Sequence, residues 1–279
     1  MSSSFGARLA ALSGPERLCV GIDPHPSTLD SWGLPDNAEG TGEFARAVVD
    51  AAIAGGIRLI KPQVALFERQ GVSGMSVLSN LMSSARDKGI LVIADVKRGD
   101  IGTSLAGYAQ AWLEPGSDFE ADAMTAVAYQ GVGSLEPAFS LAAERGKGVF
   151  VLGATSNSEG WSIQSATTKE GDSVAQRVVS DVAHRSIRAP HSDSEWLGVV
   201  IGATTDRTQF GLDDSVLSGV PILAPGFGAQ GISLTDLTER FGSLSPSVIP
   251  TVSRSVAGDS REGIDQRVSA HVGEVQALW

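Results

Sequence analysis

The stretch LVIADVKRGDI, residues 91–101, decides how the fold is interpreted. Its first four residues are apolar and predict a buried strand, and charged residues follow where that strand ends. Side chains alternate between the two faces of a strand, so Asp95 and Lys97 point to the same side. Buried charges must compensate one another. The spacing therefore indicates either a salt-bridged strand end, with Arg98 as a further partner, or a reactive site that also includes Asp100.

Size and composition limit the possible classes of protein. The chain has 279 residues, of which 42% are hydrophobic, enough for one α/β barrel or two small domains. A net charge of −11 argues against a nucleic-acid partner but still allows a phosphorylated small molecule, which needs only a few local cations and backbone N–H groups. Cys19, the single cysteine, cannot form a disulfide framework and is expected in the core.

Membrane and export signals are not visible in the sequence. There is no apolar run of 18 residues, and the first residues, MSSSF, do not form a basic-then-apolar signal peptide. We therefore expect a soluble cytoplasmic protein with no membrane partner.

Short apolar runs alternate with segments of helical spacing along the whole chain. The strands are expected at residues 18–22, 57–60, 91–94, 121–127, 149–152, 197–201, 221–223 and 248–252. Near-continuous apolar strands with helical crossovers indicate a parallel sheet, and eight such units close into a (β/α)8 TIM barrel. We predict this α/β barrel as a single domain over residues 1–279. A doubly wound open sheet is less favoured, because no glycine-rich fingerprint follows the first strand.

Polar residues collect where the predicted strands end, which is where such barrels carry their function. These positions are Asp23, Lys61, Asp95, Lys97, Asp100, Ser156, Gln230 and Arg254. The charges contributed by the second and third strands alternate in sign. The long polar segment 155–172 is either a solvated insertion or a lid.

A glycine-rich loop, PGFGAQG, follows the seventh strand at residues 225–231. Taken alone, Gly226 and Gly228 indicate a tight turn, and Arg254 alone indicates a surface ion pair. Together they predict a phosphate cradle, because the loops after strands seven and eight bind phosphate in this fold and arginine matches phosphate bidentately. No metal site is predicted, because the four histidines (His25, His184, His191 and His271) lack metal-ligand spacing.

The segment DVKRGDI, residues 95–101, resembles the signature of the orotidine 5′-phosphate decarboxylase family. A short D-x-K-x-x-D triplet is shared with related phosphosugar barrels, but further pieces occur in family order. They are GIDP (21–24), KPQ (61–63), FE (67–68), TSN (155–157), GAT (202–204), PGFGAQG (225–231) and SR (253–254). The resemblance is to the longer bacterial subgroup and covers nearly the whole chain.

The resemblance implies decarboxylation of orotidine 5′-phosphate to uridine 5′-phosphate in de novo pyrimidine synthesis, without a cofactor. Lys97 would protonate C6 after carbon dioxide leaves, and Asp95 would sit against the substrate carboxylate. Lys61 and Asp100 would complete a Lys-Asp-Lys-Asp network, with Asp100 reaching across a homodimer into the partner's site.

The resemblance also implies how the nucleotide is held. Asp23 and Lys61 would bind the ribose hydroxyls, and Ser156 would read the amide edge of the pyrimidine. Gln230 would bridge the base and the phosphate, which Arg254 would clamp. The other implied binding residues are Ser104, Gly226, Gly228 and Ser253. Ser104 is a departure, because the family usually has threonine there.

The chemistry agrees with this reading. No residue suggests a cofactor that could act as an electron sink, so charge at the ring carbon must be stabilised electrostatically. An ammonium held between carboxylates stays protonated, which suits proton donation rather than Schiff-base formation. Two alternatives stay open: a magnesium-dependent phosphosugar aldolase or 3-keto acid decarboxylase on the same barrel, and a catalytically silent barrel that senses a nucleotide.

Overall fold

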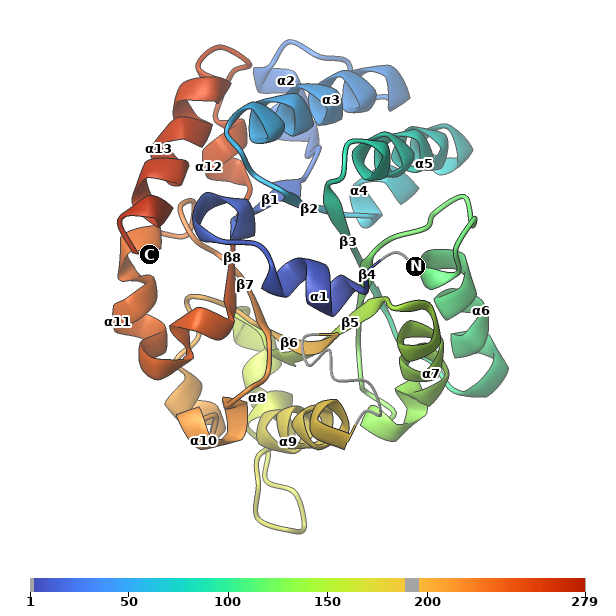
Figure 1. Cartoon of the computed structure of the whole chain (residues 1–279), viewed down its shortest axis with the longest axis vertical. Coiled ribbons are helices and arrows are strands. Elements are labelled where there is room, and N and C mark those ends of the chain that lie inside the picture. Colours follow the sequence, from blue (N-terminus) through green and yellow to red (C-terminus); the bar gives the residue numbers. More distant parts are fainter. Residues whose placement is uncertain (1–2, 189–195, 279) are drawn as a thin grey trace.

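Eight parallel strands form a closed barrel in sequence order (Figure 1). The computed structural model describes residues 3–188 and 196–278; His191 lies outside these residues. The strands are β1 Cys19–Ile22, β2 Leu59–Pro62, β3 Leu91–Arg98, β4 Ala123–Ala126, β5 Gly148–Ala154, β6 Leu197–Ile201, β7 Ile222–Pro225 and β8 Val248–Val252. Because β1 pairs with both β2 and β8, the predicted TIM barrel is confirmed and the open sheet is wrong.

Helices cover the outside of the barrel (Figure 1). They are α2 Pro26–Ser31, α3 Ala38–Ala54, α4 Ala65–Glu68, α5 Gly71–Asp87, α6 Gly102–Leu113, α7 Glu136–Arg145, α8 Trp161–Gln164, α9 Val174–Arg188, α10 Asp214–Leu217, α11 Leu237–Phe241, α12 Arg254–Ala257 and α13 Ile264–Gln276. Short 3-10 turns occur at Gly14–Arg17, Val132–Leu135, Ser158–Gly160, Arg207–Phe210, Leu234–Asp236 and Gly242–Ser247. In the described part of the chain, no helix combines the length and hydrophobicity needed to cross a membrane.

The polar segment 155–172 is more ordered than a bare loop. It contains the 3-10 turn Ser158–Gly160 and α8, and its end pairs Thr167 with Ser173. The Trp161 ring packs edge-on against Phe210, with the centroids 5.1 Å apart. Whether the segment closes over a ligand stays a prediction.

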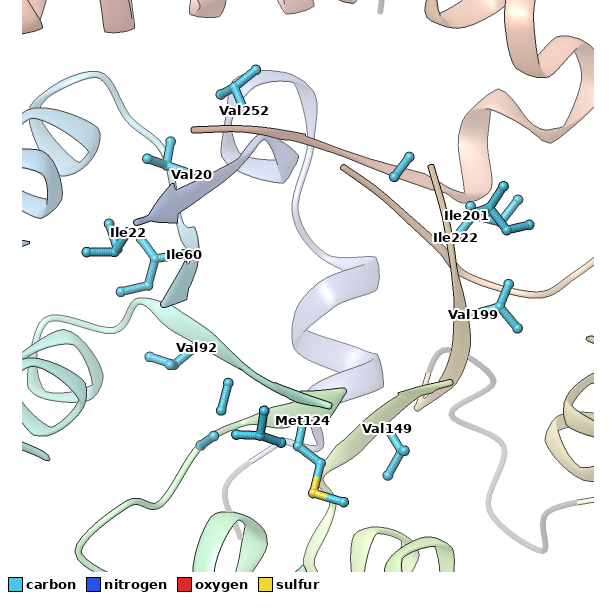
Figure 2. Packing of buried hydrophobic residues seen from close by; sticks show 14 of the residues in the cluster. Val20, Ile22, Ile60, Val92, Met124, Val149, Val199, Ile201, Ile222 and Val252 are labelled. Carbon is cyan, nitrogen blue, oxygen red and sulfur yellow. The ribbon is translucent and has the colours of Figure 1, made fainter. Parts of the chain in front are cut away.

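Alternation along the strands separates the barrel into an outer apolar shell and a filled interior. Figure 2 shows the outward side chains pointing away from the barrel axis: Val20, Ile22, Ile60, Val92, Met124, Val149, Val199, Ile201, Ile222 and Val252. Their inward neighbours form a second cluster that includes Cys19, Leu59, Leu91, Ile93, Phe150, Leu223 and Ile249. The barrel interior is therefore packed at its N-terminal end, and polar residues are left to the other end.

An N-terminal helix that the sequence did not predict closes the bottom of the barrel. Figure 1 shows α1 (Phe5–Ala10) lying across the barrel opening. Phe5 and Leu9 belong to the interior cluster, and the Phe5 ring meets Phe150 edge-on at 6.0 Å. Arg8 holds the helix in place with a 2.7 Å ion pair to the buried Asp122. Residues 1–17 therefore include a structural plug for the core.

Replacing Phe5 with alanine is expected to lower the free energy of unfolding by about 3–5 kcal/mol, because a buried aromatic ring is removed and a cavity is left. Urea titration followed by fluorescence or circular dichroism measures the change. Val72→Ala is a suitable control, since Val72 is 86% exposed and its truncation should change stability by about 0.5 kcal/mol or less. Equal stability of the Phe5 variant and the wild type would contradict the plug.

The Cys19 thiol lies in the interior cluster and is fully buried, as predicted. Burial raises its pKa to about 12, although the nearby Lys61 ammonium opposes the shift.

At pH 8 a thiol reagent should label native Cys19 roughly a thousandfold more slowly than the denatured chain. Because the folded thiol keeps a proton that the unfolded thiol releases above its ordinary pKa of 9.0, stability should fall as the pH rises from there toward 12. Rapid labelling of the native protein would contradict this burial.

Candidate active site

Two ammonium groups converge on one carboxylate at the C-terminal mouth of the barrel. Asp95 Oδ2 accepts from Lys61 Nζ at 2.8 Å, and Asp95 Oδ1 accepts from Lys97 Nζ at 2.6 Å. The side chains of Asp95 and Lys61 are 10% and 7% exposed, whereas that of Lys97 is 43% exposed. The predicted same-side placement of Asp95 and Lys97 is therefore confirmed, and only the outer member of the cluster faces solvent.

Attraction between opposite charges keeps the buried side chains of Asp95 and Lys61 ionised. Burial alone would raise the pKa of Asp95, but the Lys61 and Lys97 ammonium groups outweigh it and hold that pKa well below its usual range. Burial alone would lower the pKa of Lys61, but the carboxylates of Asp95 and Asp23 outweigh it and hold that pKa above its ordinary value. The mouth of the barrel thus presents fixed charges that need no reorganisation when charge develops in a substrate.

An unusual backbone conformation aims Lys97 into the mouth. Lys97 has φ +47°, in the left-handed region that non-glycine residues rarely adopt, and the β3–β4 register shifts between Ala94 and Arg98. Thr125 on β4 stabilises the turn because its hydroxyl accepts from the Lys97 N–H and donates to Asp95 Oδ1, both at 2.9 Å. Such strain at a charged residue is typical of functional sites.

Arg98 and Gly99 follow Lys97 directly and make contacts outside the Asp95 cluster. Gly99 is required by close approach, since a Cβ atom there would lie 2.3 Å from the Val127 carbonyl oxygen. Arg98 faces away from the Asp95 cluster: it pairs with Glu68 on α4, and its guanidinium lies 5.7 Å from the centre of the Tyr108 ring. Arg98 is therefore not part of a salt bridge with Asp95.

Asp100 and Ser104 lie apart from the cluster within one chain. Asp100 Oδ1 accepts from the N–H of Ile101 at 2.8 Å, and no bond between its carboxylate and Lys97 occurs in the described residues. Ser104 is exposed in the first turn of α6. A single chain therefore assembles three members of the implied Lys-Asp-Lys-Asp network, and the part of Asp100 across a dimer stays a prediction.

A pocket of about 470 Å³ opens beside the charge cluster. The buried Lys61 and Thr251 line it, together with Asp23. Asp23 Oδ2 accepts from the Ser253 hydroxyl, while its buried Oδ1 has no hydrogen-bond partner among the described residues. A Cβ atom on Gly21 would lie 2.7 Å from Ser253 Cβ, so glycine there makes this contact possible. Asp23 Oδ1 is available to accept from a ligand hydroxyl.

The pocket is also lined by a glycine-rich loop and an arginine. The loop residues Gly226, Ala229 and Gln230 line it together with Arg254. Gly226 has φ +117°, and the Gln230 side chain lies back over it, with its Oε1 accepting from Thr204 at 3.4 Å. The Arg254 guanidinium is exposed and has no ion pair within the described chain. Its charge is therefore available to an anionic ligand, and the predicted binding of phosphate by this arginine and the 225–231 loop stays a prediction.

Three predicted binding residues have other surroundings. Gly228 does not line the pocket, and its α-carbon instead lies against Ser255. Ser253 lines the pocket, but its hydroxyl donates a hydrogen bond to Asp23. Ser156 is exposed after β5, next to Gly202 at the end of β6.

Sequence reasoning missed several residues that the fold brings to the site. Thr125 joins the charge cluster from β4. Gln63 accepts from Lys97 Nζ at 3.2 Å, although it was quoted only as part of a motif. His25 and Thr251 line the pocket. Their positions after or within strands were the available signal, because strand ends meet at one face of a barrel.

Comparisons with known proteins agree with this geometry. The family model "Orotidine 5′-phosphate decarboxylase / HUMPS family" matches residues 16–263. Orotidine 5′-phosphate decarboxylases from Salinispora tropica and Corynebacterium efficiens are 48% and 44% identical, covering 91% and 96% of this chain and 89% and 95% of their own. A crystal structure from Streptomyces avermitilis, assigned as the same enzyme, aligns with a TM-score of 0.88 at 41% identity, covering 99% of this chain and 96% of its own. The chain belongs to the orotidine 5′-phosphate decarboxylase / HUMPS family.

Proposed function

We propose that this chain decarboxylates orotidine 5′-phosphate to uridine 5′-phosphate in pyrimidine synthesis, with Lys97 as the proton donor. The observation that carries the proposal is the contact of both Lys61 and Lys97 with Asp95 beside a pocket that ends at Arg254. In its favour, the named relatives at 42–48% identity are orotidine 5′-phosphate decarboxylases.

The chemistry assigns a step to each charged group. The bond between C6 and the carboxyl carbon breaks, carbon dioxide leaves, and the electron pair stays at C6. A proton from Lys97 Nζ then forms the new C6–H bond, and solvent restores the ammonium. Asp95 would face the substrate carboxylate, and Lys61 and Lys97 would supply the positive charge that stabilises the developing carbanion. The chain's own residues supply these charges, so the proposal needs no cofactor or metal.

Binding energy from the distant phosphate supports that step. Arg254 and the 225–231 loop would hold the phosphate, while Asp23 and Lys61 would hold the ribose. Ser156 and Gln230 would reach the base, and Ser104 completes the proposed set. Interactions remote from the reacting carbon can drive loop closure and exclude water, which strengthens the electrostatic contacts inside. We extend this role to segment 155–172 as a lid.

A homodimer is part of the proposal. Asp100 follows β3 and is bonded only to its own next amide in the described chain, so its carboxylate is free to complete the charge network of a second copy. The exposed Ile101, 61% accessible, lies next to it and suits an interface.

Loss of ultraviolet absorbance from orotidine 5′-phosphate, in buffer with a chelator and no added metal, tests the function. Turnover under these conditions is the expected result. Activity that requires added magnesium would favour the alternative of a magnesium-dependent phosphosugar aldolase or 3-keto acid decarboxylase on the same barrel. Tight nucleotide binding without turnover would favour a catalytically silent sensor.

A further inference from the structure

Three side chains connected by hydrogen bonds lie behind the 225–231 loop, outside the pocket. His271 Nε2 is 2.9 Å from Ser255 Oγ, and His271 Nδ1 is 3.0 Å from Glu274 Oε2. Ser255 belongs to the short helix α12, and the other two residues belong to α13. The His271 side chain is only 12% exposed although α13 lies on the outside of the barrel.

The hydrogen-bond chemistry determines which atom donates and which accepts in each of these two contacts. A carboxylate only accepts hydrogen bonds, so His271 Nδ1 carries a proton toward Glu274. In the neutral ring, Nε2 is then the acceptor, and the Ser255 hydroxyl donates to it. Each hydrogen bond polarises the next, so Glu274 orients the His271 ring, and the ring in turn orients the Ser255 hydroxyl.

Ser255 rests directly against the loop that lines the anion end of the pocket. A Cβ atom on Gly228 would lie 2.4 Å from Ser255 Oγ and 3.7 Å from His271 Cε1. Gly228 has φ +76°, and its N–H donates to the carbonyl oxygen of Ile232 at 2.7 Å. The Ser255–His271 pair therefore supports the back of the loop, whose front, including Gly226 and Gln230, faces the pocket.

Ser255 also follows Arg254 directly in the chain, so one residue links both halves of the anion site. A serine–histidine–carboxylate chain can activate a nucleophile. Here the Gly228 α-carbon occupies the space beside Ser255 Oγ, so no substrate carbonyl could approach it. The arrangement is suited to holding the loop, not to covalent chemistry.

We propose that Ser255, His271 and Glu274 are positioning residues that hold the 225–231 loop and Arg254 in the phosphate-binding geometry before the nucleotide arrives. This inference rests on the proposed function. A preorganised cradle loses less freedom on binding, so breaking the support should weaken phosphate binding while the chemistry of the bound substrate is retained.

The test compares Ser255→Ala, His271→Ala and the double variant with the wild type. Each single variant should raise KM for orotidine 5′-phosphate roughly three- to tenfold, the factor expected for one lost hydrogen bond, with kcat nearly unchanged. The double variant should show no more than the larger single effect, because the residues act through one contact. Dissociation constants for uridine 5′-phosphate should rise in parallel, whereas those for uridine should not.

A surface variant, the smallest of the test variants and a conservative replacement separate positioning from general damage. His184→Ala removes an exposed histidine on α9, whose ring lies 2.7 Å from the carbonyl oxygen of Ser180 in the same helix, and should leave KM unchanged. Ser255→Ala removes a single hydroxyl, so it remains informative if His271→Ala fails to fold. His271→Gln, which can still donate and accept, should recover part of the loss.

The possible outcomes distinguish this inference from the function itself. Unchanged KM in active single variants, additive effects, or an equal loss with uridine would overturn the positioning role alone. A wild type that binds uridine 5′-phosphate without decarboxylating the substrate would overturn the proposed function alone, and the binding comparison would still test the loop support.

Discussion

Lys97→Ala is expected to lower kcat for orotidine 5′-phosphate by about 10³-fold or more, because the variant loses both the proposed proton donor and one of the two positive charges proposed to stabilise the carbanion. Lys61 and Thr125 still contact Asp95, so the remaining cluster stays compensated. Since the Lys97 side chain is 43% exposed, the fold should survive its removal. Steady-state turnover and product binding are the two measurements.

Lys88→Ala is the matched control for this substitution. Lys88 also pairs with an aspartate, Asp50, at 3.1 Å, but the pair lies on exposed helical surface. Such pairs contribute little to stability, so activity and unfolding should both match the wild type. Turnover by the Lys97 variant near the wild-type rate would remove the proposed mechanism, whereas binding of uridine 5′-phosphate with no turnover would support it.

Arg254→Ala is expected to raise KM for orotidine 5′-phosphate about 10- to 100-fold, the range for losing hydrogen bonds from a charged group. The guanidinium has no ion pair in the described structure, so its removal leaves no buried charge without a partner. The phosphate-free nucleoside orotidine separates the possible causes. Its slow turnover should be the same for variant and wild type, because the proposed contact of Arg254 is to the phosphate alone.

Arg261→Ala controls for loss of positive charge near the same face. Arg261 precedes α13 and pairs with Glu43 on α3 at 2.9 Å, with 63% of its side chain exposed. Its removal should leave both substrates unaffected. A comparable loss for orotidine in the Arg254 variant would show that Arg254 acts on something other than the phosphate.

Local patterns were enough to predict the architecture and most of the charged site. The strand and helix periodicities depend on neighbouring residues, and eight alternating units have few ways to close. The same-side placement of Asp95 and Lys97 was predicted from the two-residue repeat of a strand, although the left-handed φ of Lys97 also sets the direction of its side chain. Lys61 followed from the end of the preceding strand. The barrel and the contacts among these three side chains are confirmed, because each required only short-range geometry and one rule about barrel mouths.

Contacts between distant parts of the chain required the tertiary structure. Barrel closure sets Thr125 under Lys97 and brings the Ser253 hydroxyl to Asp23, 230 positions away. It also gives α1 an apolar opening to fill, and places His271 behind Gly228. The sequence determined which residues could be charged, buried or turned, since those properties are local. Which of them meet depends on strand register and helix packing around a closed barrel, and no local pattern encodes either.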